Sequence, residues 1–184
     1  NAVLSSMMAT LFARSFETEE HAKRIGDLCA IVGMKLNLSH DDIDRLRLFA
    51  YLHDIGKIGI SDQILNKPGP LNEEELVVMR THPEIGYRIA MSSPDFASIA
   101  DLILTHHERW DGTGYPNHLS GEKIPILARI LAVADAYDAM TEDRVYRKAL
   151  SAKAAMDEIR KNAGTQFDPR IAQVFLEIVE QDDL

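Results

Sequence analysis

Residues 45–60 read RLRLFAYLHDIGKIGI, and this stretch decides the fold. Leu46, Phe49 and His53 follow i, i+3, i+7 spacing, which places them on one face of a helix. Two large apolar side chains predict that this face points into a hydrophobic core. His53 therefore occupies a position that should be apolar, and the carboxylate of Asp54 follows it directly.

In three other predicted helices, a polar side chain likewise occupies a position on an otherwise apolar face. The three faces are Ile99, Leu102 and His106; Leu127, Leu131 and Asp135; and Glu17, His21, Ile25 and Leu28. A buried imidazole or carboxylate is costly unless it is paired or coordinated. Four helices that aim such groups inward are explained together by a shared metal cluster in the core.

The donor types agree with a transition-metal site. Imidazole nitrogens and carboxylate oxygens suit Fe, Mn, Zn, Co or Ni, and the lack of thiolates argues against a structural zinc site. Taken singly, a histidine on an apolar face is more often a hydrogen-bonded core residue, so the hypothesis depends on the whole set. So many donors imply two or three ions, with Asp54 suited to bridge a pair. The candidate ligands are Glu17, His21, His53, Asp54, His82, His106, His107 and Asp135.

Helical spacing recurs along the whole chain, and no stretch alternates for long enough to predict a strand. The predicted class is all-α, a compact bundle of helices over 2–15, 18–36, 40–53, 72–80, 82–91, 95–108, 125–141, 151–162 and 169–181. Asn72 with Glu75 resembles a capping box, Asp168 before Pro169 resembles an N-cap, and Gly164 can end a helix. Two long connections, 54–71 and 109–124, are rich in Gly and Pro and are candidate functional loops.

We expect two parts: an N-terminal helix or linker over 1–16, leading from a missing upstream domain, and one domain over 17–184. The stripe of Leu4, Met8 and Leu11 in the first part is equally well explained as core. The absence of an initiator Met also suggests an excised piece of a longer protein.

Composition narrows the class of protein. The chain has 184 residues, of which 46% are apolar and 27% charged, as in a globular domain. The formal charge of −9 argues against binding a nucleic-acid polymer. No segment predicts a membrane span or a secretory signal, and the single cysteine agrees with a reducing compartment, so we expect a cytoplasmic protein without membrane contact.

The assembled motifs resemble the HD-GYP family, a subgroup of the HD-domain metal-dependent phosphohydrolases. They run in order along the chain from about Glu17 onward: FETEEH at 16–21, HDIGKIGI at 53–60, THPEIGYRI at 81–89, HHERWDGTGYP at 106–116 and ADAYDAMTEDRVYR at 134–147. The resemblance implies an HD-domain bundle with ligands at His53, Asp54, His82, His106, His107 and Asp135. It also implies iron or manganese, with Glu17 and His21 holding a third ion, so that a trinuclear site is favoured.

The activity implied by this resemblance is that of a bacterial phosphodiesterase in signal transduction. Such enzymes open cyclic di-GMP to pGpG and often onward to GMP through a hydroxide that bridges two metals, and some act on cyclic GMP-AMP. Asp54 and Lys57 are the expected catalytic residues. The expected substrate contacts are Lys57, Gly112, Gly114, Tyr115, Arg144 and Arg147, although the two arginines can also be read as surface charge at a helix end.

Two other functions compete with this one. An HD phosphohydrolase that acts on other nucleotides would share the His-Asp pair but not the GYP signature. A catalytically silent module that senses cyclic dinucleotides or docks a protein would usually lack one of the ligands, and here the set is complete. In either case a sensory or regulatory domain is the expected upstream partner.

Overall fold

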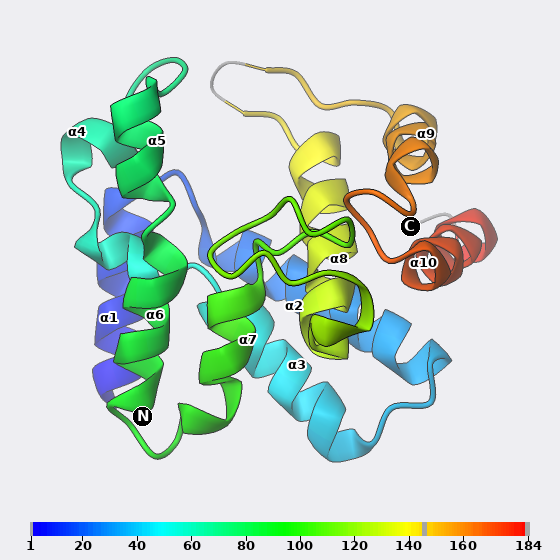
Figure 1. Cartoon of the computed structure of the whole chain (residues 1–184), viewed down its shortest axis with the longest axis horizontal. Helices are drawn as coiled ribbons and strands as arrows, with labels where there is room; N and C mark the ends of the chain where they lie inside the picture. The colour runs from blue at the N-terminus through cyan, green and yellow to red at the C-terminus, as the bar shows by residue number, and fades with distance from the viewer. Residues whose placement is uncertain (1, 145–146, 183–184) are drawn as a thin grey trace.

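The computed structural model describes residues 2–144 and 147–182, and within those ranges the chain forms helices joined by loops, with only isolated β-bridges (Figure 1). The predicted all-α class is therefore confirmed. The α-helices are α1 (Ala2–Arg14), α2 (Glu19–Lys35), α3 (His40–Leu52), α4 (Asp62–Leu65), α5 (Glu73–Met79), α6 (His82–Met91), α7 (Ala100–Thr105), α8 (Ile126–Thr141), α9 (Ala152–Asn162) and α10 (Pro169–Asp182).

The core forms where α2, α3 and α8 pack together, with α7 beside α3 and the pair α9 and α10 at one end (Figure 1). The largest side chains that are almost wholly buried include Ile25, Phe49, Leu131 and Phe175. Burying each such side chain contributes about 1.5–3 kcal/mol. This core fixes the ends of α3 and α7, where the predicted ligands lie.

The first helix belongs to the same core. Met8 and Leu11 of α1 are only 2% and 1% exposed, as the core interpretation of their stripe requires. The C-terminal end of α1 packs on the short 3-10 helix η1 (Ile55–Gly59), which follows the His-Asp pair. The predicted division of the chain into a part over 1–16 and a domain over 17–184 stays a prediction. Residues 1, 183 and 184, at the ends of these ranges, lie outside the described part.

Most helix boundaries agree with the sequence within a residue or two, and the predicted caps are confirmed. Asn72 and Glu75 form a reciprocal capping box, the Asp168 carboxylate accepts a hydrogen bond from the Arg170 amide, and Gly164 has φ +87°. These sites were predictable because each depends on one residue type with a specific local hydrogen bond or dihedral angle.

Two predictions about local structure were wrong. The helix expected over 95–108 is a short 3-10 turn, η2 (Ala97–Ile99), followed by α7, which ends at Thr105. The long connections were also not free of helix: the segment 54–71 contains η1 and α4, and the segment 109–124 contains the 3-10 turn η3 (Gly121–Lys123). Single turns of helix are too short to produce the periodic pattern on which the prediction depended.

None of the helices in the described ranges combines the length and the hydrophobicity needed to span a bilayer.

Candidate metal centre and adjoining cavity

The His53-Asp54 pair lies where α3 ends and η1 begins. His53 still has helical dihedral angles, whereas Asp54 has φ −96° and ψ 11°, so the backbone turns between them and both side chains point into one space. The two residues are only 2% and 8% exposed. A regular helix would separate neighbouring side chains by about 100°, so the helix end is what allows this pair to act together.

Gly56 brings α6 against this turn. A Cβ atom on Gly56 would lie 1.8 Å from the carbonyl oxygen of His82 and 2.6 Å from the amide of Gly86, so the backbones of η1 and α6 touch. The contact carries His82 to within 3.3 Å of Asp54, measured from Nε2 to Oδ1. The close packing of η1 on α6 therefore requires a glycine at this position of the HDIGK motif.

Three buried histidines are held in the same way. The Nδ1 atoms of His53, His82 and His106 lie 2.7, 2.7 and 2.6 Å from the carbonyl oxygens three residues earlier, those of Ala50, Met79 and Ile103. Because a carbonyl only accepts, each Nδ1 donates, and in the neutral ring Nε2 then carries the lone pair. Such hydrogen bonds commonly orient imidazoles that bind metals through the other nitrogen.

The Nε2 atoms of these histidines surround the Asp54 carboxylate and belong to two groups of donors. The histidine group consists of Asp54, His82, His106 and His107, and the glutamate group consists of Glu17, His53 and Asp54; within each, one donor atom per residue lies within 4.8 Å of the others. Asp54 Oδ1 faces His82 and His106 at 3.3 and 3.5 Å, and Oδ2 lies 3.1 Å from His53 Nε2. One carboxylate thus presents an oxygen to each group, as a bridging ligand does.

The chemistry of His53 fits a bound cation. Its Nε2 atom is buried and makes no hydrogen bond of acceptable geometry, although it lies 3.1 Å from the Asp54 carboxylate. A buried polar atom without a partner is costly and rare. Burial lowers the pKa of His53, but the carboxylates of Asp54, Asp135 and Glu17 outweigh it and raise that pKa to about 10. This position therefore attracts positive charge, which a divalent metal can supply.

Two histidines of the other group, His106 and His107, favour the neutral form. Burial lowers the pKa of His106, and burial together with His106 and His82 holds the pKa of His107 well below its usual range. His82 Nε2 lies 3.3 Å from His106 Nε2 and 3.1 Å from His107 Nε2. Three imidazole nitrogens at these separations match the adjacent ligands of one ion with bonds of about 2.1 Å.

Lys57 lies between two carboxylates of the glutamate group. Its Nζ atom is 2.5 Å from Glu17 Oε1 and 3.1 Å from Asp54 Oδ2. Burial lowers the pKa of Lys57, but both carboxylates outweigh this and raise it, so the ammonium stays charged. Burial and Asp54 raise the pKa of Glu17. The predicted catalytic lysine is thus within reach of the centre.

His21 and Asp135 lie beside the two groups but outside both. His21 Nε2 is 3.9 Å from Asp135 Oδ1, and its Nδ1 is 2.5 Å from Asp138 Oδ2. Asp138, which the sequence analysis missed, is 3% exposed and also accepts a hydrogen bond from Arg24 at 2.9 Å. Its position one helical turn after Asp135, within the same motif, was a signal that could have found it. The roles of His21 and Asp135 as ligands stay predictions.

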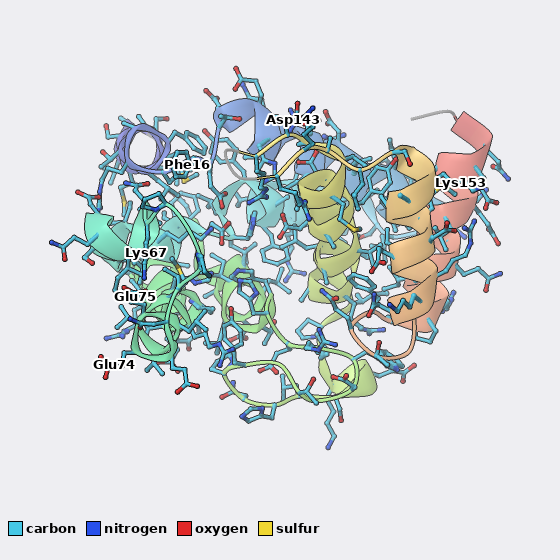
Figure 2. All side chains as sticks on the ribbon, turned by 90° about the horizontal axis from the view of Figure 1, so that it is seen from above. Phe16, Lys67, Glu74, Glu75, Asp143 and Lys153 are labelled. Atoms are coloured by element: carbon cyan, nitrogen blue, oxygen red, sulfur yellow. The ribbon has the colours of Figure 1, made fainter. Side chains whose placement is uncertain are left out.

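A cavity of about 450 Å³ opens beside the glutamate group. The side chains of Glu17, His21 and Lys57 line its inner side and are 19%, 12% and 18% exposed, whereas Arg144, which also lines it, is an exposed residue. Arg147, the other predicted substrate contact on this segment, is not part of the lining and donates a hydrogen bond to the carbonyl of Ala139 at 2.6 Å. Figure 2 labels Phe16, Lys67 and Asp143, which line the same cavity from three separate segments.

The loop that contains Gly114, Tyr115 and Pro116, here called the GYP loop, packs against the histidine group and does not line this cavity. The Tyr115 ring stacks on His107 with centroids 4.9 Å apart and planes inclined by 13°. A Cβ atom on Gly114 would lie 2.4 Å from the carbonyl oxygen of His107, while Gly112 has φ +79°. Close approach to the chain's own backbone thus explains Gly114, and the expected substrate contacts of all three loop residues stay predictions.

A second residue missed by the sequence analysis anchors this loop. Glu108 is only 5% exposed, and its carboxylate accepts hydrogen bonds from the amides of Asn117 and Leu119 at 2.7 and 3.0 Å. It directly follows the two histidines, so one short segment both supplies ligand candidates and orders the loop. Only its place inside the HHE motif could have indicated this role.

Comparison with known proteins places this geometry in a family. The chain is 41% identical over 170 residues to a cyclic di-GMP phosphodiesterase of Thermotoga maritima, covering 91% of this chain and 46% of the relative. It is 37% identical over 167 residues to the 3′3′-cGAMP-specific phosphodiesterase 2 of Vibrio cholerae, covering 90% and 32%. The chain thus spans half or less of the length of these relatives.

A solved structure shows the same fold. The crystal structure of a cyclic GMP-AMP specific phosphodiesterase of V. cholerae superposes with a TM-score of 0.73 at 22% identity, covering 96% of this chain and 48% of that chain. A family model described as HD domain matches residues 5–171, which include every residue of the two donor groups. The chain therefore belongs to the HD domain family.

Proposed function

We propose that this chain is a metal-dependent phosphodiesterase that hydrolyses cyclic di-GMP to pGpG and onward to GMP. The observation that carries the proposal is the Asp54 carboxylate, whose two oxygens face two separate groups of donors. A lysine and an open cavity adjoin the same carboxylate. Relatives that share 41% and 37% of aligned residues with this chain are named as phosphodiesterases of cyclic dinucleotides, which supports this substrate class.

The donors fit divalent transition metals, and we propose iron or manganese. The histidine group would hold one ion and the glutamate group a second, with Asp54 shared between them. We propose a third ion toward His21 and Asp135, which would make the site trinuclear. When bound, paired divalent ions lower the pKa of a coordinated water and neutralise charge that develops on phosphoryl oxygens.

The chain's own residues orient the substrate around these ions. Lys57 is held by Glu17 and Asp54 at the inner side of the cavity, where its ammonium can donate to a nonbridging phosphate oxygen. Arg144, exposed at the cavity, can contact the second phosphate in a bidentate manner. Arg147 would have to leave the carbonyl of Ala139 to do the same.

The wider setting is proposed on the same basis. Because the chain spans half or less of its relatives, we propose a sensory or regulatory domain elsewhere in the full protein. We also propose a cytoplasmic location, as expected from the sequence. Cyclic GMP-AMP is the second candidate substrate, since the 37% identical relative from V. cholerae is named as specific for it.

Anaerobic purification with elemental analysis, followed by chromatography of the products from cyclic di-GMP, tests this proposal. The wild-type protein should contain iron or manganese and release pGpG and GMP. Asp54→Ala should lower turnover by at least about 1,000-fold, because it removes the ligand shared by both groups. Glu17→Ala should chiefly lose one ion and slow the second hydrolytic step.

Asp44→Ala is a matched control, because Asp44 lies on the exposed side of the same helix as His53. Its metal content and turnover should equal those of the wild type. Unchanged metal and activity in Asp54→Ala would contradict the proposed site. Faster turnover of nucleoside triphosphates than of cyclic dinucleotides would favour the broader phosphohydrolase, and binding of cyclic di-GMP without any product would favour the silent module.

A further inference from the structure

The cavity beside the glutamate group has two chemically different sides. Polar groups of Glu17, His21 and Lys57 lie on its inner side. The half-buried apolar residues that line the cavity from α4, α5 and the connection between them, which we call the apolar wall, are Ile64, Leu65, Leu71 and Met79. Lys67 of the same connection also lines the cavity, and its ammonium is paired with Glu75. Ligand sites commonly combine such an apolar surface with a few converging polar groups.

Phe16 adds an aromatic ring to the apolar lining of this cavity, and the ring is unusually exposed. It lines the cavity and is 63% exposed. Within residues 2–144 and 147–182, every other Phe, Tyr and Trp side chain is at least partly buried. Packing in the core therefore does not explain Phe16, whereas a flat ligand that covers its ring would.

The residues that line the cavity with Phe16 indicate the class of that ligand. Phe16 directly precedes Glu17, whose carboxylate lies 2.5 Å from Lys57 Nζ. Phe16 and Lys57 line the same cavity, so a ligand with a phosphate at Lys57 and a base on the Phe16 ring would occupy a single site. Aromatic side chains bind bases by stacking, since every base presents a π face.

We propose that Phe16 and the apolar wall form a purine-base subsite, in which one base of the cyclic dinucleotide stacks on the Phe16 ring. This inference rests on the proposed function and adds a recognition element to it. The other base and second phosphate would lie toward Arg144, which lines the same cavity. Phe16 binds the substrate in this arrangement but takes no part in bond cleavage.

Steady-state kinetics with cyclic di-GMP tests the subsite. Phe16→Ala should raise KM by roughly 10-fold or more, the loss expected for one stacked base. Its kcat should stay within about 2-fold and its metal content should be unchanged, because the ring touches no reacting atom. Phe16→Tyr should keep the wild-type KM. Met34→Ala is the matched control, since Met34 is 54% exposed but lies at the opposite end of α2 from the cavity.

A binding measurement separates this inference from the proposed function. Phe16→Trp in a Trp110→Phe background carries a single indole, whose fluorescence should be quenched by a hydrolysis-resistant phosphorothioate analogue of cyclic di-GMP. Wild-type turnover together with an unquenched indole and an unchanged KM in Phe16→Ala would overturn the subsite while the function stands. A wild-type protein that releases no product from cyclic di-GMP contradicts the function, and in that case the quench alone decides the subsite.

Discussion

The metal centre and the outer part of the cavity are built by different means. His53, His82 and His106 lie at helix ends, are nearly inaccessible, and are each held by a hydrogen bond to a backbone carbonyl. In the outer cavity, Phe16 and Arg144 lie on connecting segments and are exposed. The donors proposed to bind metal are thus preorganised by the core, whereas the residues proposed to contact the substrate lie on loops that vary without cost to the fold.

The largest effect should come from breaking the backbone contact behind the metal centre. In Gly56→Ala, the new Cβ would meet the carbonyl of His82 at 1.8 Å, and backbone atoms cannot move aside as a flexible side chain does. We expect the free energy of unfolding to fall by about 3 kcal/mol or more. Metal binding should be lost with it, because η1 and α6 separate. Chemical denaturation and elemental analysis measure both.

Gly26→Ala is the matched control for this prediction. Gly26 is also a buried glycine near the core, but a Cβ there would have its nearest neighbours at 3.9 Å. Alanine is the better helix former, so this variant should be unchanged or more stable by up to about 1 kcal/mol. Equal loss of stability in the two variants would mean that the close contact between η1 and α6 is not the cause of the loss in Gly56→Ala.

The same contrast explains what could be predicted from the sequence. The ligand candidates were found because a polar residue on an apolar helix face breaks a regular pattern, as His53 does beside Leu46 and Phe49. Asp138 was missed because its partners, His21 and Arg24, are distant in the chain and only the fold brings them together. The apolar part of the cavity lining was missed for the same reason, since Phe16 and the apolar wall belong to separate segments without periodicity.

A smaller effect should follow from changing the missed carboxylate. Asp138 orients His21, which we propose as a ligand, through the 2.5 Å contact at Nδ1. Asp138→Asn keeps the shape but removes the charge, and loss of such an outer partner typically weakens metal binding about 10- to 100-fold. We expect one ion per chain to be lost during dialysis against a chelator, at concentrations that leave the histidine group loaded.

A surface pair provides the comparison for Asp138. Asp157 forms an ion pair with Arg160 at 2.9 Å on α9, with 60% of its own side chain exposed. Asp157→Asn should retain the wild-type metal content, because exposed pairs contribute little and this one is remote from the centre. The same metal content in Asp138→Asn and the wild type would show that Asp138 does not support a ligand.

The smallest effect should follow from a substitution of Arg14, which contacts the turn between the metal centre and the cavity. Arg14, at the end of α1, donates to the carbonyls of Ile58 and Ile60 at 2.8 and 2.9 Å, directly after Lys57. Arg14→Met removes both hydrogen bonds, so the turn that carries Lys57 loses its outer support. We expect a loss of about 1–2 kcal/mol in stability, and a fall in kcat of roughly 3- to 10-fold as Lys57 is displaced.

Arg45 distinguishes support of Lys57 from general stability. It makes a similar bond, from Nη2 to the carbonyl of Ser98 at 3.0 Å, but ties α3 to the segment before α7, away from the cavity. Arg45→Met should lose comparable stability and keep the wild-type kcat. If both variants lose kcat in proportion to their stability, Arg14 only stabilises the fold. If Arg14→Met alone lowers kcat and Arg14→Lys recovers part of it, α1 controls the position of Lys57, because a lysine can still donate to one of the two carbonyls.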